Sequence, residues 1–363
     1  MPEIILYVSG HGFGHAVRCA MLCRALLDAA PGLTIGIRTT APAWIFPSDV
    51  VVDRCSIDVG VVQPNSLEVD AGATLDRYAA HLEGEGPLLA AEAELVRAAG
   101  ARVVVADVPA AAFAIAARAG LPGIGLANFS WDWIYEPFVE ATSAGWPLLD
   151  HLRAQYAQAT LLLRLPFHGD LSVFPRIEDV PLIGRRSTTD RLETRRRLGL
   201  PLEAPLVVFS FGGHASTGPD AARLANLGEY AFVATSTAVQ AERAIRQGRN
   251  LFVLPELAEG YVDLLAASDA VIMKPGYGIV ADLLANRVPA LYVSRDGFRE
   301  EPILIRALEE EGRAVSLARD ALDRLDLGPA LDRLLRLDRP WTTRPIDGAE
   351  VAARRILEIA GLQ

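Results

Sequence analysis

A glycine-rich segment near the start of the sequence, SGHGFGHAVR (residues 9–18), carries two histidines where a buried strand is expected to turn into a helix. The dipole of a helix disfavours the cationic form of an imidazole in its first turn, so such a histidine stays neutral and can accept a proton. We therefore predict a general base here, with His15 as the first candidate and His11 as the second. The alternative is an imidazole that only caps the helix backbone.

The same segment departs from the glycine fingerprint of dinucleotide-binding proteins. Gly10 and Gly12 fit the G-x-G-x-x-G spacing, whereas the third glycine position is His15. The acidic residue expected about 20 residues further on is also missing, because the second strand reads IGIRTT. This excludes NAD or FAD binding at the loop. Its backbone amides still form a candidate phosphate or acceptor loop of Gly10, His11, Gly12 and Gly14.

A second glycine loop, KPGYG (residues 274–278), lies between a strand and a helix in the later half of the chain. Lys274 is the only lysine in the sequence, so 34 of the 35 basic residues are arginine. A compact ammonium beside backbone amides at a helix start suits a diphosphate. We predict that Lys274, Gly276, Tyr277 and Gly278 bind a substrate that carries a diphosphate, which we call the donor. The alternative is that the lysine stands there by chance.

Two further segments extend this predicted donor site. Asp282 follows one helical turn later and can accept hydrogen bonds from ribose hydroxyls; its alternative is an exposed helix carboxylate. The loop SFGGHAST (residues 210–217) adds Ser210, Gly212 and Gly213 from the first strand of the later half. The G-x-x-x-x-G-K-[ST] phosphate loop of nucleotide hydrolases is absent, which excludes that kind of ATP site.

An aromatic segment, NFSWDWIYEPF (residues 128–138), surrounds Asp132 directly after an expected strand. Aromatic faces beside a carboxylate are common sugar-binding surfaces, so Asn128, Trp131 and Asp132 are candidate acceptor contacts. The alternative is a hydrophobic plug at the interface between two domains.

Short apolar runs that alternate with alanine-rich helical stretches must position these residues. The runs IILYVSG, LTIGIRTT, RVVVAD and GIGLANFS predict strands, and a helix is expected from Ala16 to about Ala29. Continuous Val, Ile and Leu strands between helices indicate parallel strands that are covered on both faces. The pattern restarts at PLVVFSFGG (residues 205–213) and continues through EYAFVAT, NLFVLP, DAVIMKPG and PALYVS.

The sequence therefore predicts an α/β protein with two Rossmann-like, doubly wound parallel-sheet domains that face each other across a cleft. The first domain is expected over residues 1–190 and the second over residues 191–345, with a hinge near residues 183–203. The final helix, at about residues 346–363, is expected to pack back on the first domain.

Composition excludes several classes of protein. The chain has 363 residues, a formal net charge of -10, 51% hydrophobic residues and three cysteines. Disorder is excluded by the hydrophobic content, and a nucleic-acid partner by the acidic charge without a basic run. The cysteines show no CxxC pair, and no apolar stretch has the length of a signal peptide or a membrane span. These features predict a cytoplasmic protein.

Together the loops resemble those of GT-B glycosyltransferases, with the acceptor domain first and the nucleotide-sugar domain second. The block KPGYGIVADLLANRVPALYV is similar to the donor segment of UDP-glycosyltransferases and of the peptidoglycan N-acetylglucosaminyltransferase. A narrower resemblance, from about residue 5 to residue 320, is to the amino-terminal, glycosyltransferase-like half of plant arabinokinases. It rests on GHGFGHAVR, DVGVVQPNSLEVD, VVADVP, NFSWDWIYEPFV, LLLRLPF, DVPLIGRR, FSFGG, KPGYGIVADLLA and SRDGFREEPILIRALEE.

The resemblance implies roles for individual residues. His15 matches the usual base, Asp107 matches the aspartate that orients that base, and Asp282 takes the place of the acidic residue that holds the ribose. Asp107 has the alternative of a strand-end helix cap. The sugar-kinase half of the plant proteins has no counterpart in this sequence, so phosphorylation of a sugar is not expected.

The resulting hypothesis is an inverting glycosyltransferase that uses a nucleoside-diphosphate sugar, with UDP as the expected nucleotide, and an unidentified acceptor. No Asp-x-Asp element is present, so neither a metal ion nor another cofactor is expected. Two alternatives remain, which are a nucleotide-sugar sensor without turnover and a UDP-sugar 2-epimerase. The epimerase is disfavoured because its acidic catalytic set is missing.

Overall fold

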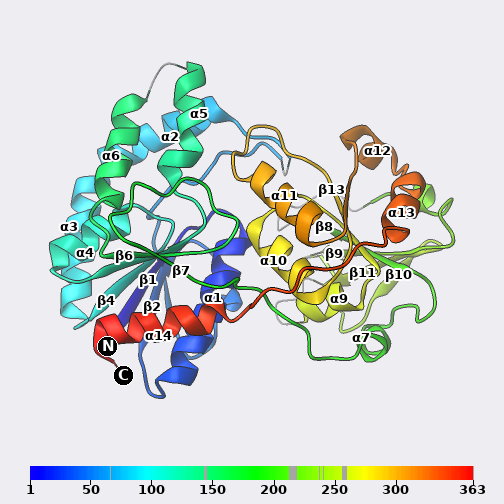
Figure 1. Cartoon of the computed structure of the whole chain (residues 1–363), viewed down its shortest axis with the longest axis horizontal. Coiled ribbons are helices and arrows are strands. Elements are labelled where there is room, and N and C mark those ends of the chain that lie inside the picture. The colour runs from blue at the N-terminus through cyan, green and yellow to red at the C-terminus, as the bar shows by residue number, and fades with distance from the viewer. Residues whose placement is uncertain are drawn as a thin grey trace.

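The computed structural model describes residues 1–65, 67–142, 145–211, 219–236, 238–239, 241–255 and 260–362. These residues form two lobes, each built on a central sheet with helices packed against it (Figure 1). The predicted class, two doubly wound α/β domains, is confirmed. No helix in the described part of the chain is long and apolar enough to cross a membrane.

The N-terminal lobe contains a sheet in which seven described strands pair in the order β3-β2-β1-β4-β5-β6-β7, all parallel. Every residue of the first strand, IILYV, is buried, as expected of a parallel strand covered on both faces. The strands are β1 (Ile4–Val8), β2 (Ile35–Thr39), β3 (Val51–Arg54), β4 (Val103–Asp107), β5 (Gly123–Ala127), β6 (Leu161–Arg164) and β7 (Ile177–Asp179).

Helices flank this sheet, and one of them comes from the far end of the chain. They are α1 (Phe13–Ala29), the 3-10 helix η1 (Ala43–Ile45), α2 (Ala71–Glu83), α3 (Glu85–Ala98), α4 (Ala111–Ala119), α5 (Trp131–Thr142), α6 (Trp146–Tyr156) and α14 (Gly348–Ala360). The last helix, α14, lies along α1 in the N-terminal lobe (Figure 1). Its apolar stripe, which includes Ala352, Ala353 and Ile356, belongs to the same core cluster as Leu22 and Leu26 of α1.

The C-terminal lobe repeats the architecture with the strand order β10-β11-β9-β8-β12-β13-β14 among its described residues. All pairs are parallel except β10 with β11, which is antiparallel at the sheet edge. The strands are β8 (Leu206–Ser210), β9 (Ala231–Ser236), β10 (Ile245–Gln247), β11 (Leu251–Pro255), β12 (Ala270–Met273), β13 (Ala290–Tyr292) and β14 (Ala314–Ser316). The helices are α7 (Arg191–Leu198), α8 (Ala221–Leu224), α9 (Tyr261–Ala267), α10 (Tyr277–Asn286), α11 (Glu301–Glu311), α12 (Arg319–Arg324) and α13 (Gly328–Leu335).

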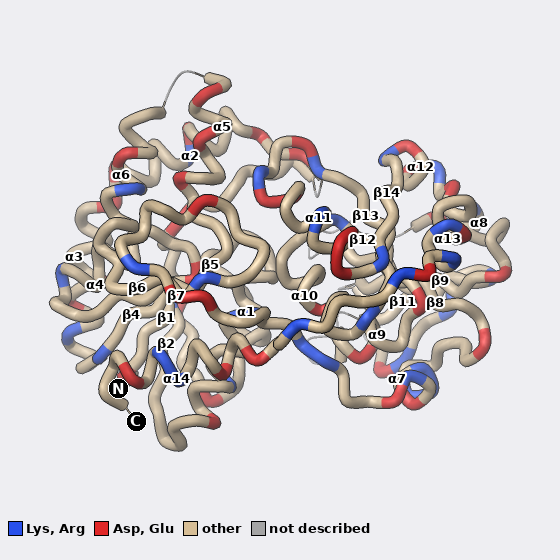
Figure 2. The backbone as a smooth tube through the Cα atoms, in the orientation of Figure 1, with Lys and Arg blue, Asp and Glu red and all other residues tan. Residues whose placement is uncertain are grey.

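Two stretches of chain, residues 180–187 and 340–347, connect the lobes; we call them the crossing segments. They run side by side, and both carry basic residues (Figure 2). Ile183 and Asp347 form an antiparallel bridge, and the backbone N–H of Gly348 donates to the carbonyl of Leu182. A Cβ at Gly348 would lie 2.1 Å from the carbonyl oxygen of Pro181, so the close approach of the two backbones requires glycine.

Both sheets place the predicted loops at the point where the strand order reverses. In the first sheet the reversal lies between β1 and β4, and in the second between β8 and β12. Ligands of open α/β sheets bind beyond the carboxyl ends of the strands at such a point. His15 follows β1 and Lys274 follows β12, whereas Asp107 and Ser210 are the last residues of β4 and β8.

Candidate active site

The glycine loop after β1 brings His15 into the first turn of α1. The helix begins at Phe13, three residues before the predicted start, and its N-cap is Gly12, whose φ of 76° favours glycine. No side chain caps this helix start. A Cβ at Gly10 would lie 1.9 Å from Oγ1 of Thr40, so a larger residue there would displace that side chain. The first backbone amides of α1 are therefore not covered by a capping side chain.

His15 and Asp107 form a buried pair. Nδ1 of His15 lies 2.8 Å from Oδ1 of Asp107, and the two residues are 8% and 1% exposed. Arg18 shares the carboxylate, because its Nε donates to Oδ2 at 2.8 Å and its Nη2 to Oδ1 at 2.5 Å. Burial by itself would raise the pKa of Asp107, but Arg18 and then His15 hold that pKa well below its usual range. Asp107 is therefore an anion in this structure.

The charge of Asp107 fixes the tautomer of His15. An ionised carboxylate can only accept hydrogen bonds, so the proton of a neutral His15 ring resides on Nδ1. The lone pair is then on Nε2, as a general base at this position would require. The edge of the ring packs against Phe129 at a centroid distance of 5.6 Å, which holds the imidazole in place.

His11 is arranged differently from His15. Its Nδ1 accepts from the backbone N–H of Val61 at 3.3 Å, which leaves the proton of a neutral ring on Nε2. The ring stacks on Phe298 of the C-terminal lobe at 6.2 Å and meets Trp131 edge-on at 5.6 Å. With Nε2 protonated, His11 is suited to donate a hydrogen bond, whereas His15 is suited to accept one.

The opposite wall carries Lys274 and Ser210 at the ends of β12 and β8. Burial, and secondarily Arg295, lower the pKa of Lys274 to about 8. Arg295 is itself tied to Glu301 and to the carbonyl of Pro275. Ser210 accepts a hydrogen bond from the hydroxyl of Tyr261 at 2.5 Å. The other two predicted residues of the β8 loop, Gly212 and Gly213, lie outside the described residues.

The starts of α1 and α10 approach each other closely. A Cβ at Gly278 would lie 3.5 Å from Cα of Gly14, and α10, like α1, has a glycine N-cap, Gly276, without a capping side chain. Tyr277 lies beneath the guanidinium of Arg18 at 5.0 Å, and its buried hydroxyl has no hydrogen-bond partner among the described residues. Two positive helix ends thus converge on one region, as suits an anion.

Asp282 is engaged within the protein. It is 3% exposed, and its oxygens accept from the backbone N–H, Nε and Nη2 of Arg185 at 2.8, 3.0 and 2.6 Å. The alternative, an exposed helix carboxylate, is therefore wrong, and the ribose contact stays a prediction. A ribose contact would require Arg185 to release at least one of these oxygens. Asn286, one turn later, also holds the same crossing segment through the carbonyl of Arg185.

The aromatic segment is mostly core in this structure, and the predicted contacts of Trp131 and Asp132 with an acceptor stay a prediction. Trp131 is 0% exposed, donates from Nε1 to Asp58 and stacks on Tyr135. Asp132 is 6% exposed and accepts from Arg153 at 3.4 Å. The alternative interpretation, a hydrophobic plug, describes these residues better.

Asn128 is also buried, yet it joins the base to the other lobe. Its Oδ1 accepts from Nη1 of Arg18 at 3.0 Å, and its Nδ2 donates to Oε1 of Glu300 at 2.6 Å. The sequence reasoning missed Arg18 and Glu300. Arg18 follows His15 by three residues, which places both on one helix face, so GHAVR contained a usable signal. Glu300 has no local signal, because its role depends on how the lobes meet.

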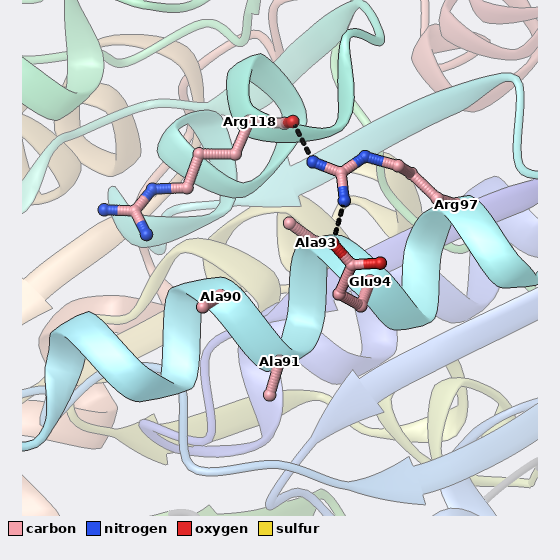
Figure 3. A pocket seen from close by; sticks show the side chains of 6 residues that line it. All are labelled: Ala90, Ala91, Ala93, Glu94, Arg97 and Arg118. Carbon is pink, nitrogen blue, oxygen red and sulfur yellow. Dashed lines mark hydrogen bonds and ion pairs between the residues drawn. The ribbon is translucent and has the colours of Figure 1, made fainter.

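A hollow of about 420 Å³ lies elsewhere, on the outer surface between α3 and α4 (Figure 3). The lining residues on α3 are Ala90, Ala91, Ala93, Glu94 and Arg97, and Arg118 comes from α4. Arg97 is bonded to Glu94 and to the carbonyl of Arg118, which holds this wall together. The hollow is remote from the ends of β1 and β4. No group of three or more His, Cys, Asp or Glu side chains in the described part of the chain is placed to hold a metal ion.

Known proteins resemble the chain in sequence and in fold. Over 366 aligned residues the chain is 33% identical to an L-arabinokinase of Arabidopsis thaliana, and the match covers 98% of this chain but 34% of that protein. No protein-family model matches the chain. Among solved structures, the glycosyltransferase of kitacinnamycin matches with a TM-score of 0.63 and 15% identity over 99% of this chain and 95% of that one.

A second solved structure is Phytolacca americana UGT2 in complex with UDP-2-fluoro-glucose and pterostilbene. It matches with a TM-score of 0.58 and 14% identity over 99% of this chain and 94% of that one. At these identities the likeness establishes the arrangement of the two lobes. The chain has the GT-B fold of these glycosyltransferases, and its sequence is similar to that of a region spanning 34% of a plant L-arabinokinase.

Proposed function

We propose that the chain is a glycosyltransferase that moves a sugar from a nucleoside-diphosphate sugar, with UDP as nucleotide, to an acceptor hydroxyl with inversion at the anomeric carbon. The observation that carries this proposal is the His15–Asp107 pair, which lies at the β1/β4 reversal point and faces the donor lobe. Because the buried carboxylate accepts a hydrogen bond from Nδ1–H, Nε2 is the nitrogen that can accept a proton. The GT-B fold supports the proposal.

In the proposed reaction, the acceptor hydroxyl gives its proton to Nε2 of His15 as its oxygen bonds to the anomeric carbon. The bond from that carbon to the diphosphate oxygen breaks at the same time, and the nucleoside diphosphate leaves with the electron pair. Asp107 stabilises the imidazolium that forms. The reaction needs no oxidant or reductant, and no residue of the site requires a metal ion for this step.

The leaving diphosphate gains charge, and the donor lobe offers groups that can stabilise it. The ammonium of Lys274 and the backbone amides at the start of α10 lie at the β8/β12 reversal point. Such preorganised donors stabilise charge that develops in a transition state more strongly than water does. Gly276, Tyr277 and Gly278 supply the backbone, and Asp282 can join the site once Arg185 is displaced from it.

The test uses slow hydrolysis of the donor by water, because the acceptor is unknown. His15→Ala is expected to lower UDP release about 10²–10⁴-fold, as loss of a general base does. UDP affinity by calorimetry and the melting temperature should stay near those of the wild type. His151→Ala is the matched control, since His151 lies on α6 and pairs with Glu85. UDP release at the wild-type rate in His15→Ala would refute the assignment.

A second candidate is a sensor that binds the nucleotide sugar without turnover. It is favoured by one observation, namely that the similar plant protein is named for a kinase reaction and not for glycosyl transfer. Tight donor binding by the wild type, together with no UDP release from any donor or acceptor, would place this candidate first.

A further inference from the structure

An unbroken series of polar contacts links the base to the opposite lobe. It runs from His15 through Asp107, Arg18 and Asn128 to Glu300, with distances of 2.8, 2.8, 3.0 and 2.6 Å for the successive contacts. These residues are 8%, 1%, 4%, 1% and 4% exposed. Because all five are buried, a change in one partner is not compensated by water.

The chemistry of Asn128 fits its place in the series. On one side it must accept from the guanidinium of Arg18, and on the other it must donate to the carboxylate of Glu300. An amide does both, whereas a carboxylate can only accept and an ammonium can only donate. The amide therefore joins a cation to an anion and takes one orientation.

Glu300 reaches Asn128 on a short stretch of the C-terminal lobe, residues 298–300, which we call the docking segment. It lies between β13 and α11, on the side facing the N-terminal lobe (Figure 1). Phe298 packs in the N-terminal core cluster and stacks on His11. Arg299 donates to the carbonyl of Trp133 and to Glu136. The last contact of the series thus exists only while the lobes are together.

The other end of the series controls the base. Arg18 binds both oxygens of Asp107, so the position of the guanidinium determines where the carboxylate holds Nδ1 of His15. Arg18 also lies over Tyr277 of the donor lobe, which gives it a second contact across the lobe interface. Its place is therefore defined by groups of both lobes, Asn128 on one side and Tyr277 on the other.

Building on the proposed transferase function, we propose that Asn128 and Glu300 are positioning residues that couple docking of the donor lobe to the orientation of the His15–Asp107 pair. Docking brings Glu300 to Asn128, Asn128 fixes Arg18, and Arg18 fixes Asp107. The base is then correctly oriented only when the donor lobe is in place. Hydrolysis of the donor is suppressed in any state in which the lobes are apart.

The experiment exchanges the hydrogen-bond donor and acceptor in the contact between Asn128 and Glu300. N128D places two carboxylates together and breaks the contact, although the new side chain can still accept from Arg18. In N128D/E300Q the glutamine amide donates to the aspartate, so the contact is restored in reverse and the total charge equals that of the wild type. R299M is the matched control, because it removes another interlobe contact of the docking segment without touching the series.

We expect N128D to lower kcat for donor hydrolysis roughly 10- to 100-fold, the size of effect that a small displacement of a reacting group causes. The dissociation constant of UDP, measured by calorimetry, should change less than about threefold. N128D/E300Q should recover most of the lost kcat, and R299M should alter KM or the UDP dissociation constant while kcat stays within about threefold. A double variant no faster than N128D, or an R299M variant as slow as N128D, overturns the proposal.

A second readout separates this inference from the proposed function. Nitrogen-15 NMR of the histidine rings, with the His15 signal assigned from His15→Ala, reports which ring nitrogen carries the proton. With UDP bound, the wild type and N128D/E300Q should show the Nδ1–H form of His15, and N128D a mixture of forms. If the wild type never turns over but this pattern holds, the transferase proposal fails and the positioning role stands. An identical His15 spectrum in all three proteins overturns the positioning role.

Discussion

At the scale of the residue, two charged side chains define the site, and they differ in whether the protein supplies an opposite charge. Asp107 is buried but balanced by Arg18 and His15, so its pKa is low. Lys274 is mostly buried without a hydrogen-bonded carboxylate among the described residues, so its pKa is lowered to about 8. The protein thus stabilises the charge of Asp107 internally, whereas the charge of Lys274 is left for an anion that comes from outside.

The position of Lys274 predicts opposite effects on binding and on stability. Lys274→Met should weaken UDP binding, because a charge-assisted contact of about 1–3 kcal/mol is lost. It should also raise the free energy of unfolding at pH 7 by about 1–3 kcal/mol, because an ammonium that is costly to bury is removed. Calorimetry and chemical denaturation measure the two quantities. Lower stability together with weaker binding would contradict this account of the site.

The lowered pKa of Lys274 also predicts how binding depends on pH. The protonated form attracts the diphosphate, so UDP affinity should fall as the pH rises through about 8, and Lys274→Met should lack this dependence. Between about 8 and 10.5 the unfolded chain retains the proton that the folded chain has lost. The contribution of Lys274 to the free energy of unfolding therefore rises with pH across that window. A UDP dissociation constant that is flat from pH 7 to pH 9.5 would argue against a phosphate contact.

Asp107→Asn tests the orientation of the base at the same scale. Asparagine can present its oxygen to Nδ1 of His15, but it carries no charge to stabilise the imidazolium, and it leaves Arg18 without its anion. We expect donor hydrolysis at a rate between those of the wild type and His15→Ala. We also expect a loss of stability of about 3–5 kcal/mol, because Arg18 becomes a buried, unpaired cation. Wild-type stability would show that Arg18 finds another acceptor, and the measurement is a denaturant titration.

At the scale of the element, α10 serves two structures at once. Its first residues face the proposed diphosphate site, and its last two turns hold the crossing segment through Asp282 and Asn286. A Cβ at Gly184 would lie 2.9 Å from the carbonyl oxygen of Ala281, so the crossing segment rests directly on the helix. Any movement of the segment therefore moves the helix that carries the donor site.

This arrangement predicts that Arg185 stabilises the fold through α10. Arg185→Met leaves the buried carboxylate of Asp282 without its cation, and we expect the free energy of unfolding to fall by about 2–4 kcal/mol. Arg185→Met/Asp282→Asn should recover part of that loss, because the charge is removed as well. Urea denaturation of the three proteins measures this. Arg186→Met is the control, since among the described residues Arg186 donates only to a backbone carbonyl of α10.

Elements with a strong local pattern could be predicted from the sequence, and others could not. β1 and β4 are continuous apolar runs, and both glycine loops follow such runs, so their place at the strand ends was predictable. β10 reads IRQ and is exposed at every residue, which gives it no apolar signature. For NFSWDWIY the sequence leaves a sugar-binding surface and a hydrophobic plug open, because aromatic composition does not indicate whether a helix faces inward or toward the cleft.

The candidate site was predictable to the extent that it depends on strand ends. The carboxyl ends of β1 and β4 meet at one sheet edge, so His15 and Asp107 could be paired from the sequence and the resemblance together. The partners of Asp282 and Asn128 could not be predicted, because Arg185 lies 97 positions from the first and Glu300 lies 172 positions from the second. Contacts at such separations depend on how the two lobes meet, and no local pattern encodes that.

At the scale of the whole molecule, the two lobes meet at several buried places, and we predict that they separate to let a donor enter between them. A cross-link can test this. A Cβ at Gly297 would lie 3.9 Å from Cβ of Val69, within the range of about 3.5–4.5 Å found in disulfides. Val69→Cys/Gly297→Cys therefore suits a bridge between the lobes. The native cysteines, Cys19, Cys23 and Cys55, are buried and do not compete for it.

In the oxidised double variant we expect UDP to associate at least about tenfold more slowly than with the wild type, because the lobes cannot separate. A reductant should restore the rate. The single variants are the controls, and Gly297→Cys alone should cost about 1–2 kcal/mol of stability, since φ at this position is +81°. Equal association rates before and after oxidation would mean that the donor enters without separation of the lobes. Stopped-flow measurement gives the rates.

The packing of α14 against α1 has a consequence for synthesis on the ribosome. The apolar face of α1, with Leu22 and Leu26, is translated early, yet Ala352 and Ile356, which cover it, are translated more than 300 positions later. The C-terminal lobe, whose two ends lie together at Ile183 and Asp347, can close before α14 has left the tunnel. The N-terminal lobe, which is synthesised first, therefore completes its folding last. Until then, the nascent chain carries an uncovered stripe on α1 that a chaperone can bind.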